Sequence, residues 1–160
     1  MKRFLILSDT HGDLYSIRAV INRHSEIQSI IHLGDYCKDA SIIKSDYPEL
    51  NIVTVAGNCD FVLGVPDDQV LEVEGKRIYI THGHSFGVKN GTSRLEKKAV
   101  IEKFDAVLFG HTHEPLLKRV SSIFLLNPGS LGYPRNGSKP SYAIMEVGEN
   151  ILDARILTLH

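Results

Sequence analysis

Five short apolar segments of this chain each end in a polar cluster rich in Asp, His and Asn. They are FLILSDTHG (Phe4 to Gly12), SIIHLGD (Ser29 to Asp35), IVTVAGNCD (Ile52 to Asp60), IYITHGH (Ile78 to His84) and AVLFGHTH (Ala106 to His113). Short apolar runs bounded by turn residues are typical of strands. If such strands end at one edge of a sheet, their polar side chains meet there. The pattern then predicts one metal-ligand set: Asp9, His11, Asp35, Asn58, His82, His111 and His113.

The first half of the chain alternates predicted strands and helices. We expect strands at 4–7, 29–33 and 52–55, with helices at 14–24 and 40–47 between them. This βαβ order implies parallel strands joined by right-handed crossovers. Open sheets of this kind bind ligands outside the carboxyl ends of their strands, which is where the polar clusters stand.

The second half predicts hairpins and one further helix. Strands at 70–73 and 77–81 form one hairpin, and strands at 116–120 and 123–126 form another. A helix at 93–103 has Ser93 and Glu96 in capping-box spacing. Strands at 106–109, 142–147 and 151–157 complete the set, and 127–141 is a loop rich in Gly and Pro. We therefore expect an α/β fold in which two mixed β-sheets pack face to face with helices outside.

Size and charge restrict the classes of function. The 160 residues fit one domain spanning 1–160. With 18 basic and 19 acidic residues, the chain lacks the charge expected of a protein that binds extended nucleic acid or a membrane surface. No apolar run approaches the roughly 18 residues that a membrane span needs. Two cysteines are too few for a disulfide scaffold, which favours a cytoplasmic protein.

The predicted ligand set indicates a reaction class. Carboxylate oxygens mixed with imidazole nitrogens suit manganese, with nickel, zinc, iron or cobalt as alternatives, better than calcium or magnesium. Asp35 offers a carboxylate that can be shared by two ions. Two ions about 4 Å apart can hold a phosphoryl group and lower the pKa of a bridging water. The sequence thus predicts a dinuclear centre for phosphoester hydrolysis.

The same motifs, in this order and spacing, resemble those of the calcineurin-like metallophosphoesterases. They are Asp9-Thr-His11, Gly34-Asp35, Gly57-Asn58, Thr81-His82-Gly83-His84 and Gly110-His111-Thr112-His113. The short chain and its Asn127-Pro128-Gly129-Ser130 segment resemble the small YfcE-type phosphodiesterases.

That resemblance implies a four-layer α/β/β/α sandwich and two ions joined by a bridging hydroxide. It assigns Asp9, His11 and His113 to one ion and Asn58, His82 and His111 to the other, with Asp35 between the two.

Cys59 departs from the family pattern, in which many members carry a His after Gly-Asn. A thiol with a pKa near 8.5 is a weaker general acid than imidazole near pH 7. We therefore expect weak protonation of the leaving group and a preference for acidic leaving groups such as aryl esters. The alternative is that Cys59 is a small filler. We expect Cys37 and Cys59 to be reduced thiols rather than a disulfide.

Three further residues are candidates for the site. Asp60 completes a catalytic set with Asp35 and Asn58 if it orients a ligand or a water, but it is equally suited to cap a turn. His84 and Arg135 are candidate substrate contacts together with Cys59. A solvated loop position is the alternative for Arg135.

Three functions are consistent with these residues. The leading one is a phosphodiesterase acting on a small phosphoester, because no inserted cap or basic groove is visible. A phosphomonoesterase, including a phosphoprotein phosphatase, would use the same ions. A non-enzymatic scaffold is the third, because a retromer subunit resembles this fold. Apolar loop residues at 61–63, 86 and 133 are candidates for a homo-oligomer contact.

Overall fold

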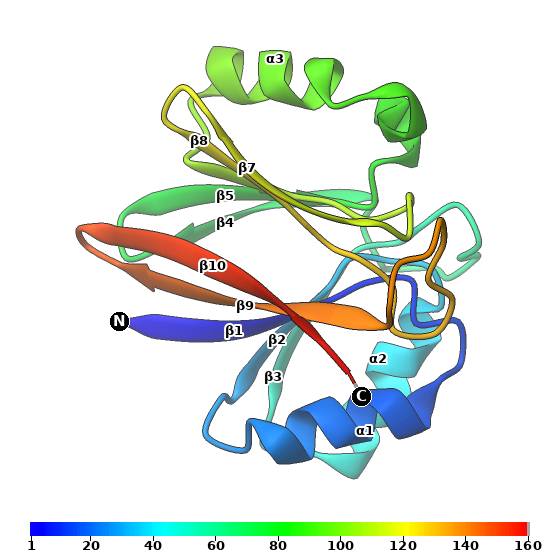
Figure 1. Ribbon diagram of the computed structural model, residues 1–160. Helices are drawn as coiled ribbons and strands as arrows, with labels where there is room; N and C mark the ends of the chain where they lie inside the picture. Colours follow the sequence, from blue (N-terminus) through cyan, green and yellow to red (C-terminus); the bar gives the residue numbers. More distant parts are fainter. Residues whose placement is uncertain (160) are drawn as a thin grey trace.

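The computed structural model describes residues 1–159 of the chain and contains two five-stranded sheets (Figure 1). The first sheet consists of β1 (Lys2–Leu7), β2 (Ser29–His32), β3 (Asn51–Thr54), β9 (Ser141–Gly148) and β10 (Ile151–Thr158). Its strand order is β10-β9-β1-β2-β3. The strands β1, β2 and β3 are parallel, whereas β9 is antiparallel to both β1 and β10. The predicted βαβ half therefore forms the parallel part of this sheet.

The second sheet has the order β4-β5-β6-β8-β7. It consists of β4 (Asp68–Val73), β5 (Lys76–Thr81), β6 (Ala106–Leu108), β7 (Pro115–Val120) and β8 (Ile123–Pro128). Both predicted hairpins are present, β4 with β5 and β7 with β8, and β6 lies parallel to β5 and β8. This sheet is therefore mixed as well.

Helices cover the two outer faces. α1 (Leu14–Arg23) and α2 (Cys37–Asp46) lie against the first sheet, and α3 (Ser93–Glu102) covers the second (Figure 1). Two short 3₁₀ turns, η1 (His84–Phe86) and η2 (Val88–Asn90), lead from β5 to α3. The predicted α/β fold with four α/β/β/α layers is confirmed. No helix within residues 1–159 is long and apolar enough to cross a membrane.

Three apolar clusters hold the layers together. One fills the space between the sheets and includes Ile6, Ile80 and Leu126, none of which has measurable exposure. The second packs α1 and α2 on the first sheet, and the third packs α3 on the second sheet. Burial of apolar surface is the main favourable term in folding, so this layered core fixes the strand ends that carry the polar clusters.

Several predicted boundaries differ from the structure. α2 begins at Cys37 rather than at residue 40, because Tyr36 takes a left-handed conformation just before it and caps it without a side-chain hydrogen bond. The predicted Ser93–Glu96 capping box is wrong, since Thr92 is the N-cap residue and its hydroxyl donates to the Glu96 carboxylate. The Gly- and Pro-rich loop begins after Pro128, which still pairs with Pro115.

Candidate metal centre

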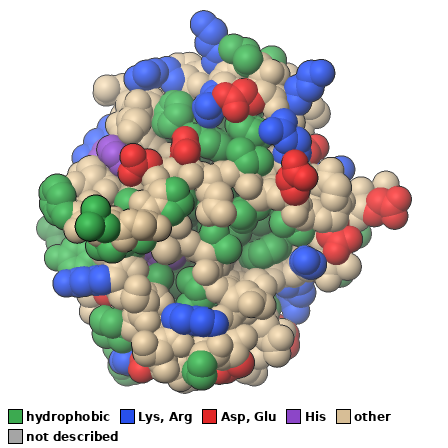
Figure 2. All heavy atoms as spheres, turned by 180° about the vertical axis from the view of Figure 1, so that it is seen from behind, with side chains coloured by type: hydrophobic (Ala, Val, Ile, Leu, Met, Phe, Trp, Pro, Cys, Tyr) green, Lys and Arg blue, Asp and Glu red, His purple; other side chains and the backbone are tan. Residues whose placement is uncertain are grey.

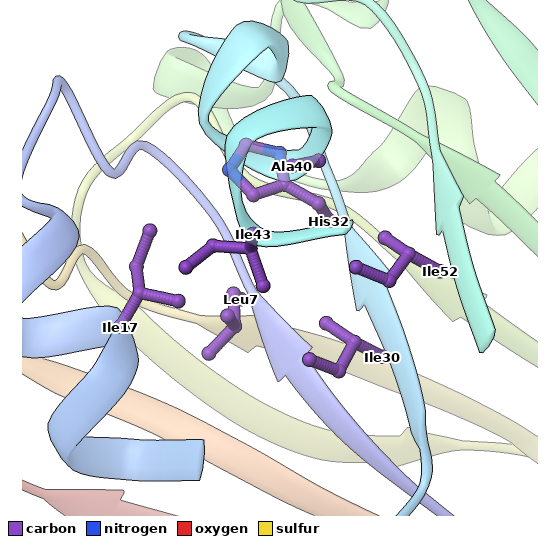
Figure 3. A pocket seen from close by; sticks show the side chains of 7 residues that line it. All are labelled: Leu7, Ile17, Ile30, His32, Ala40, Ile43 and Ile52. Carbon is purple, nitrogen blue, oxygen red and sulfur yellow. The ribbon is translucent and has the colours of Figure 1, made fainter. Parts of the chain in front are cut away.

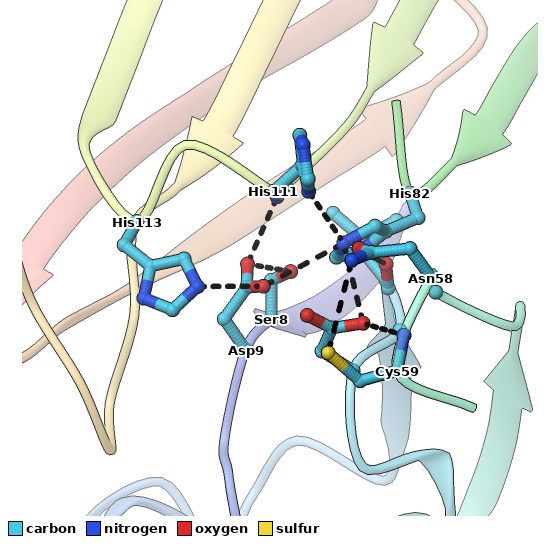
Figure 4. A network of polar contacts seen from close by, with 12 residues as sticks. Ser8, Asp9, Asn58, Cys59, His82, His111 and His113 are labelled. Carbon is cyan, nitrogen blue, oxygen red and sulfur yellow. Dashed lines mark hydrogen bonds and ion pairs between the residues drawn. The ribbon is translucent and has the colours of Figure 1, made fainter. Parts of the chain in front are cut away.

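The seven predicted ligands come from loops at the carboxyl ends of strands in both sheets. Asp9 and His11 follow β1, Asp35 follows β2 and Asn58 follows β3, all in the first sheet. In the second sheet His82 follows β5, and His111 and His113 follow β6. The two sheets therefore face each other across this group, most of which Figure 4 shows.

Four of these residues form a compact group. Ligand atoms of Asp9, His11, Asp35 and His113 all lie within 4.8 Å of one another. His113 Nε2 is 3.2 Å from Asp9 Oδ1 and 3.4 Å from His11 Nε2. His11 Nε2 is in turn 3.9 Å from Asp35 Oδ2. This is the spacing of side chains that converge on one ion.

The other histidines lie next to this group. His82 Nε2 is 3.5 Å from Asp35 Oδ1 and 3.3 Å from His111 Nδ1. Asn58 is exposed at the rim beside His82 (Figure 4), and its amide nitrogen is 3.8 Å from Cys59 Sγ. Asp35 therefore faces His11 through one carboxylate oxygen and His82 through the other.

Hydrogen bonds fix which ring nitrogens face the carboxylates. His82 Nδ1 lies 2.7 Å from the carbonyl oxygen of Leu33, and His113 Nδ1 lies 2.5 Å from that of Tyr133. A carbonyl only accepts, so each Nδ1 carries a proton, and Nε2 is the ring nitrogen that faces Asp9. A backbone acceptor behind the ring is a common support for a metal-binding histidine.

One oxygen of the Asp9 carboxylate lacks a hydrogen bond although it is buried. Asp9 Oδ2 accepts from the Ser8 hydroxyl at 2.6 Å and from the His111 N–H at 3.0 Å. Asp9 Oδ1 has no hydrogen-bond partner among residues 1–159, and the Nε2 atoms of His113 and His82 face it at 3.2 and 3.7 Å. Burying such a carboxylate oxygen without a partner is costly. A cation in front of it would satisfy this oxygen and bind the neighbouring ring nitrogens. The residues thus fit a divalent metal.

The protonation states also suit metal binding. Burial alone would raise the pKa of Asp9, but the imidazoles of His113 and His82 and the hydroxyl of Ser8 lower it below its ordinary value. Burial and the neighbouring His82 lower the pKa of His111 to about 4. Metal ligands must be deprotonated, so near neutral pH this group offers a carboxylate and a neutral imidazole.

Comparison with known proteins identifies the family. The calcineurin-like phosphoesterase superfamily domain matches residues 1–150. This chain belongs to that superfamily. The probable metallophosphoesterase YsnB of Bacillus subtilis is 31% identical over 153 residues, which cover 94% of this chain and 88% of YsnB. Phosphodiesterase YfcE of Escherichia coli is 30% identical over 172 residues, covering 91% of this chain and 88% of YfcE.

A solved structure agrees with this family. The crystal structure of a predicted phosphoesterase from Streptococcus pneumoniae matches with a TM-score of 0.80 at 31% identity, covering 98% of this chain and 89% of that one. The family consists of metal-dependent hydrolases. The chain is therefore a phosphoesterase with a candidate divalent-metal site at Asp9, His11, Asp35 and His113.

Backbone strain occurs at five of the candidate ligand positions of this phosphoesterase. Asp9, His11, Asp35, His111 and His113 have φ angles of 51°, 46°, 54°, 72° and 61°, in the left-handed region. Residues other than glycine rarely adopt this region, at a cost of about 1–3 kcal/mol each. Strain of this kind collects at functional sites, where it aims side chains that a relaxed backbone would direct elsewhere.

Two glycines let the ligand loops approach closely. A Cβ atom at Gly57 would lie 2.1 Å from Asp35 Oδ1, and one at Gly110 would lie 2.0 Å from Ser8 Oγ. Any larger residue at these positions would therefore push against a carboxylate ligand or its hydrogen-bond donor. This explains why the family motifs Gly-Asn and Gly-His carry glycine here.

A buried relay that the sequence analysis missed supports the ligand loops from below. Gly34 N–H donates to His32 Nδ1 at 3.2 Å, so His32 Nε2 carries the proton and donates to Thr10 Oγ1 at 2.9 Å. Thr10 then donates to Asp39 Oδ2 at 2.7 Å, which also accepts from Gly12 N–H. Thr10 stands between Asp9 and His11, and Gly34 precedes Asp35, so the relay joins two ligand loops to α2.

His32 also borders a small apolar cavity of about 10 Å³ under α1 and α2 (Figure 3). The other lining residues are Leu7, Ile17, Ile30, Ala40, Ile43 and Ile52. Burial among them lowers the pKa of His32 and keeps its ring neutral. A histidine within a strand does not by itself indicate this role. The feature that could have indicated it is that His32 stands three residues before Asp35.

The structure gives Asp60 and Cys59 defined surroundings. Asp60 accepts from the N–H groups of Cys37 and Gly57 at 2.9 and 2.8 Å, which is the turn-capping alternative rather than an orienting contact to a ligand histidine. The Cys59 N–H donates to Asp35 Oδ1 at 3.0 Å, and its thiol is exposed. Desolvation and the Asp35 carboxylate raise the pKa of this thiol. Both cysteines are free, as predicted.

His84 and Arg135 lie at the margin of the centre. The His84 ring centre is 5.4 Å from that of His82, and its buried Nδ1 has no hydrogen-bond partner in the described part of the chain. Arg135 is exposed, its guanidinium is 5.9 Å from the Tyr133 ring centre, and its charge contributes to lowering the pKa of His11. Both are thus near the ligands without contacting the Asp9 or Asp35 carboxylate.

Proposed function

We propose that this phosphoesterase is a phosphodiesterase that hydrolyses a small phosphodiester at a dinuclear divalent-metal centre. The observation that carries the proposal is the buried Asp9 Oδ1, which lacks a hydrogen bond and faces the Nε2 atoms of His113 and His82. A divalent cation bound in front of Asp9 Oδ1 would satisfy this oxygen and take the two ring nitrogens as ligands. Its position at the meeting point of two sheets is suited to a substrate that arrives from solvent.

In this proposal Asp9, His11 and His113 hold one ion, and Asn58, His82 and His111 hold the other. Asp35 lies between the two sets, 3.9 Å from His11 and 3.5 Å from His82, which supports a bridging role. Bound divalent ions would polarise the phosphoryl group and lower the pKa of the attacking water. The mixture of oxygen and nitrogen ligands favours manganese, with nickel, zinc, iron or cobalt as substitutes.

The residues of the chain orient the candidate metal ligands and contribute little acid catalysis. His82 and His113 are held in one tautomer by backbone carbonyls, and Asp9 is held by Ser8. Cys59 stands where many family members have His, and its raised pKa keeps the thiol protonated but makes it a weak acid. We propose that esters with acidic leaving groups, such as aryl esters, react fastest.

A diester is favoured over a monoester by charge. A monoester carries a second negative charge that needs cationic partners, whereas the basic side chains near the candidate ligands are few and include Lys38, Lys89 and Arg135. One relative, YfcE of E. coli, is described as a phosphodiesterase. On the face shown in Figure 2, basic and acidic side chains are interspersed without an extended basic area, which supports a small substrate over a long nucleic acid.

The experiment is hydrolysis by the metal-stripped protein of bis(4-nitrophenyl) phosphate and 4-nitrophenyl phosphate, with manganese, nickel, zinc or magnesium restored. We expect diester turnover that depends on the ion and is lost in Asp35→Asn. Faster turnover of the monoester would contradict the diester assignment. Metal binding without hydrolysis of either ester would favour the scaffold alternative.

Two further parts of the proposal concern the cellular setting. The free thiols of Cys37 and Cys59 support a reducing compartment, so we propose a cytoplasmic protein. The exposed apolar residues Phe61, Leu63 and Tyr133 support self-association. Sedimentation over a range of protein concentrations tests this, because a monomer at all concentrations would contradict it.

A further inference from the structure

An open pocket of about 350 Å³ adjoins the candidate metal centre. Its volume falls at the lower end of the roughly 300–1,000 Å³ found for small-molecule sites. The lining residues are His11, Tyr36, Lys38, Cys59, Asp60, Phe61 and Val62. Since His11 belongs to the candidate ligand group and Cys59 follows Asn58, the pocket borders the candidate metal centre. A substrate held at the metals would therefore extend into this space.

The outer wall of the pocket is apolar and exposed. Phe61 and Val62 are 95% and 47% exposed, although a phenylalanine of a folded protein is usually buried. The loops that follow β1 and β2 lie on the right in Figure 1 and therefore on the left in Figure 2, where hydrophobic side chains protrude from the surface. An exposed apolar patch beside a polar site is typical of a binding surface.

Tyr36 forms the inner aromatic wall. Its backbone is left-handed, with φ 65° and ψ 48°, a strained conformation for a bulky residue. This conformation places its ring centre 5.0 Å from that of His11. Strain held at a site rather than relieved is a sign that the placement of the side chain is used.

Lys38 is the cation of the pocket. Its Nζ lies 5.0 Å from the centre of the Tyr36 ring, and no carboxylate among residues 1–159 forms an ion pair with it. Asp60, the acidic residue of the pocket wall, is already engaged by the N–H groups of Cys37 and Gly57. Lys38 is therefore available to an anionic oxygen of the substrate.

We infer that this pocket binds a planar aromatic ester arm of the phosphodiester. Phe61 and Tyr36 contact the flat ring, and Lys38 meets an anionic oxygen of the phosphoryl group. The inference rests on the proposed function, because the phosphoryl group must be held by the metals for its arm to reach the pocket. The substrate class is then phosphodiesters with an aromatic substituent.

The test measures binding rather than turnover. Calorimetry with the manganese-loaded protein compares the methyl monoesters of phenyl-, cyclohexyl- and methylphosphonic acid, each of which carries one negative charge as a phosphodiester does. They share the metal-binding group, differ in the arm, and are called phenylphosphonate, cyclohexylphosphonate and methylphosphonate below. Aromatic contacts contribute about 0.5–1.5 kcal/mol beyond burial, so we expect phenylphosphonate to bind about fivefold more tightly than cyclohexylphosphonate. Methylphosphonate should bind more weakly than either.

Three variants separate the roles of the residues. Phe61→Ala should reduce the preference for the phenyl arm, because only the Tyr36 contact remains, and should leave methylphosphonate affinity unchanged. Lys38→Gln should weaken all three ligands by a similar factor. Leu63→Ala is the matched control, since Leu63 is fully exposed on the same loop and does not line the pocket. It should behave as the wild type.

Three results would overturn the inference while leaving the phosphodiesterase proposal intact. They are equal affinity for the phenyl and cyclohexyl arms, an unchanged phenyl preference in Phe61→Ala, or an equal loss in Leu63→Ala. Failure of all three phosphonates to bind the manganese-loaded protein would overturn both the inference and the phosphoester site on which it rests.

Discussion

The left-handed backbone at His11 lowers the folding stability of the chain at a position that supplies a candidate metal ligand. With φ at 46°, an alanine at this position bears the left-handed penalty of about 1–2 kcal/mol, whereas glycine does not. We predict that metal-free His11→Gly is more stable than metal-free His11→Ala by about 1 kcal/mol, although both lose a ligand. Urea unfolding of the two variants measures the difference.

The variants Ser25→Gly and Ser25→Ala form a matched pair that controls for the intrinsic preferences of glycine and alanine. Ser25 is exposed and lies outside the left-handed region, so alanine there should be at least as stabilising as glycine. If His11→Ala proved as stable as His11→Gly, the backbone at the ligand position would not be strained and this explanation would be wrong.

Gly57 makes room for the Asp35 carboxylate. Because a Cβ at Gly57 would lie 2.1 Å from Asp35 Oδ1, we predict that Gly57→Ala displaces this carboxylate and lowers metal affinity by at least about tenfold. Calorimetric titration with Mn²⁺ measures the loss. Gly148→Ala should retain wild-type affinity, because Gly148 is not left-handed and an added Cβ there would meet Ile151 and Met1 at an ordinary contact distance of 3.9 Å. Wild-type affinity in Gly57→Ala would contradict this prediction, because the loop would then have accommodated the methyl group without displacing the carboxylate.

At the scale of elements, the relay through His32 ties β2, the loop after β1 and α2 together. His32→Leu would leave the Gly34 N–H and one contact of the Thr10 hydroxyl unsatisfied in a buried place, at a cost of about 1–3 kcal/mol for each. We predict a loss of unfolding free energy together with a metal affinity that is lower by about 10- to 100-fold. Thermal unfolding and Mn²⁺ titration measure the two effects.

His24→Leu is the matched control for this relay. His24 Nε2 pairs with the Tyr142 hydroxyl at 2.8 Å, and His24 contacts none of the ligand loops in the described chain. The control should lose stability without losing metal affinity. If His32→Leu also kept its affinity for the metal, the relay would be a contribution to folding alone.

The placement of the candidate ligands was predictable from the sequence because each stands in a loop that follows an apolar strand. Parallel neighbours such as β1 and β2 then bring Asp9 and Asp35 to one sheet edge without further information. His32 was not predictable, since its partners Thr10 and Asp39 are distant in the chain and a single His in a strand names no partner. The start of α2 was missed because Tyr36 caps it without a side-chain hydrogen bond.

At the scale of the whole molecule, the candidate metal centre joins the two sheets. Asp9 and Asp35 extend from the first sheet, and His82, His111 and His113 extend from the second. A ligand that binds only the folded state stabilises it by about 2.7 kcal/mol at a hundredfold excess over its Kd. We predict that Mn²⁺ raises the unfolding midpoint of metal-free protein by about 5–10 °C. Calorimetric scans with and without a chelator measure this shift, and an unchanged midpoint would contradict it.

The number of ions per chain tests the dinuclear centre most directly. Metal-stripped protein is titrated with Mn²⁺ and examined by electron paramagnetic resonance, in which two neighbouring ions give a coupled spectrum. The account predicts two ions per chain with a coupled signal in the wild type, and loss of that coupling in Asp35→Asn. One ion per chain, or two without coupling, would contradict a centre in which Asp35 lies between both ions.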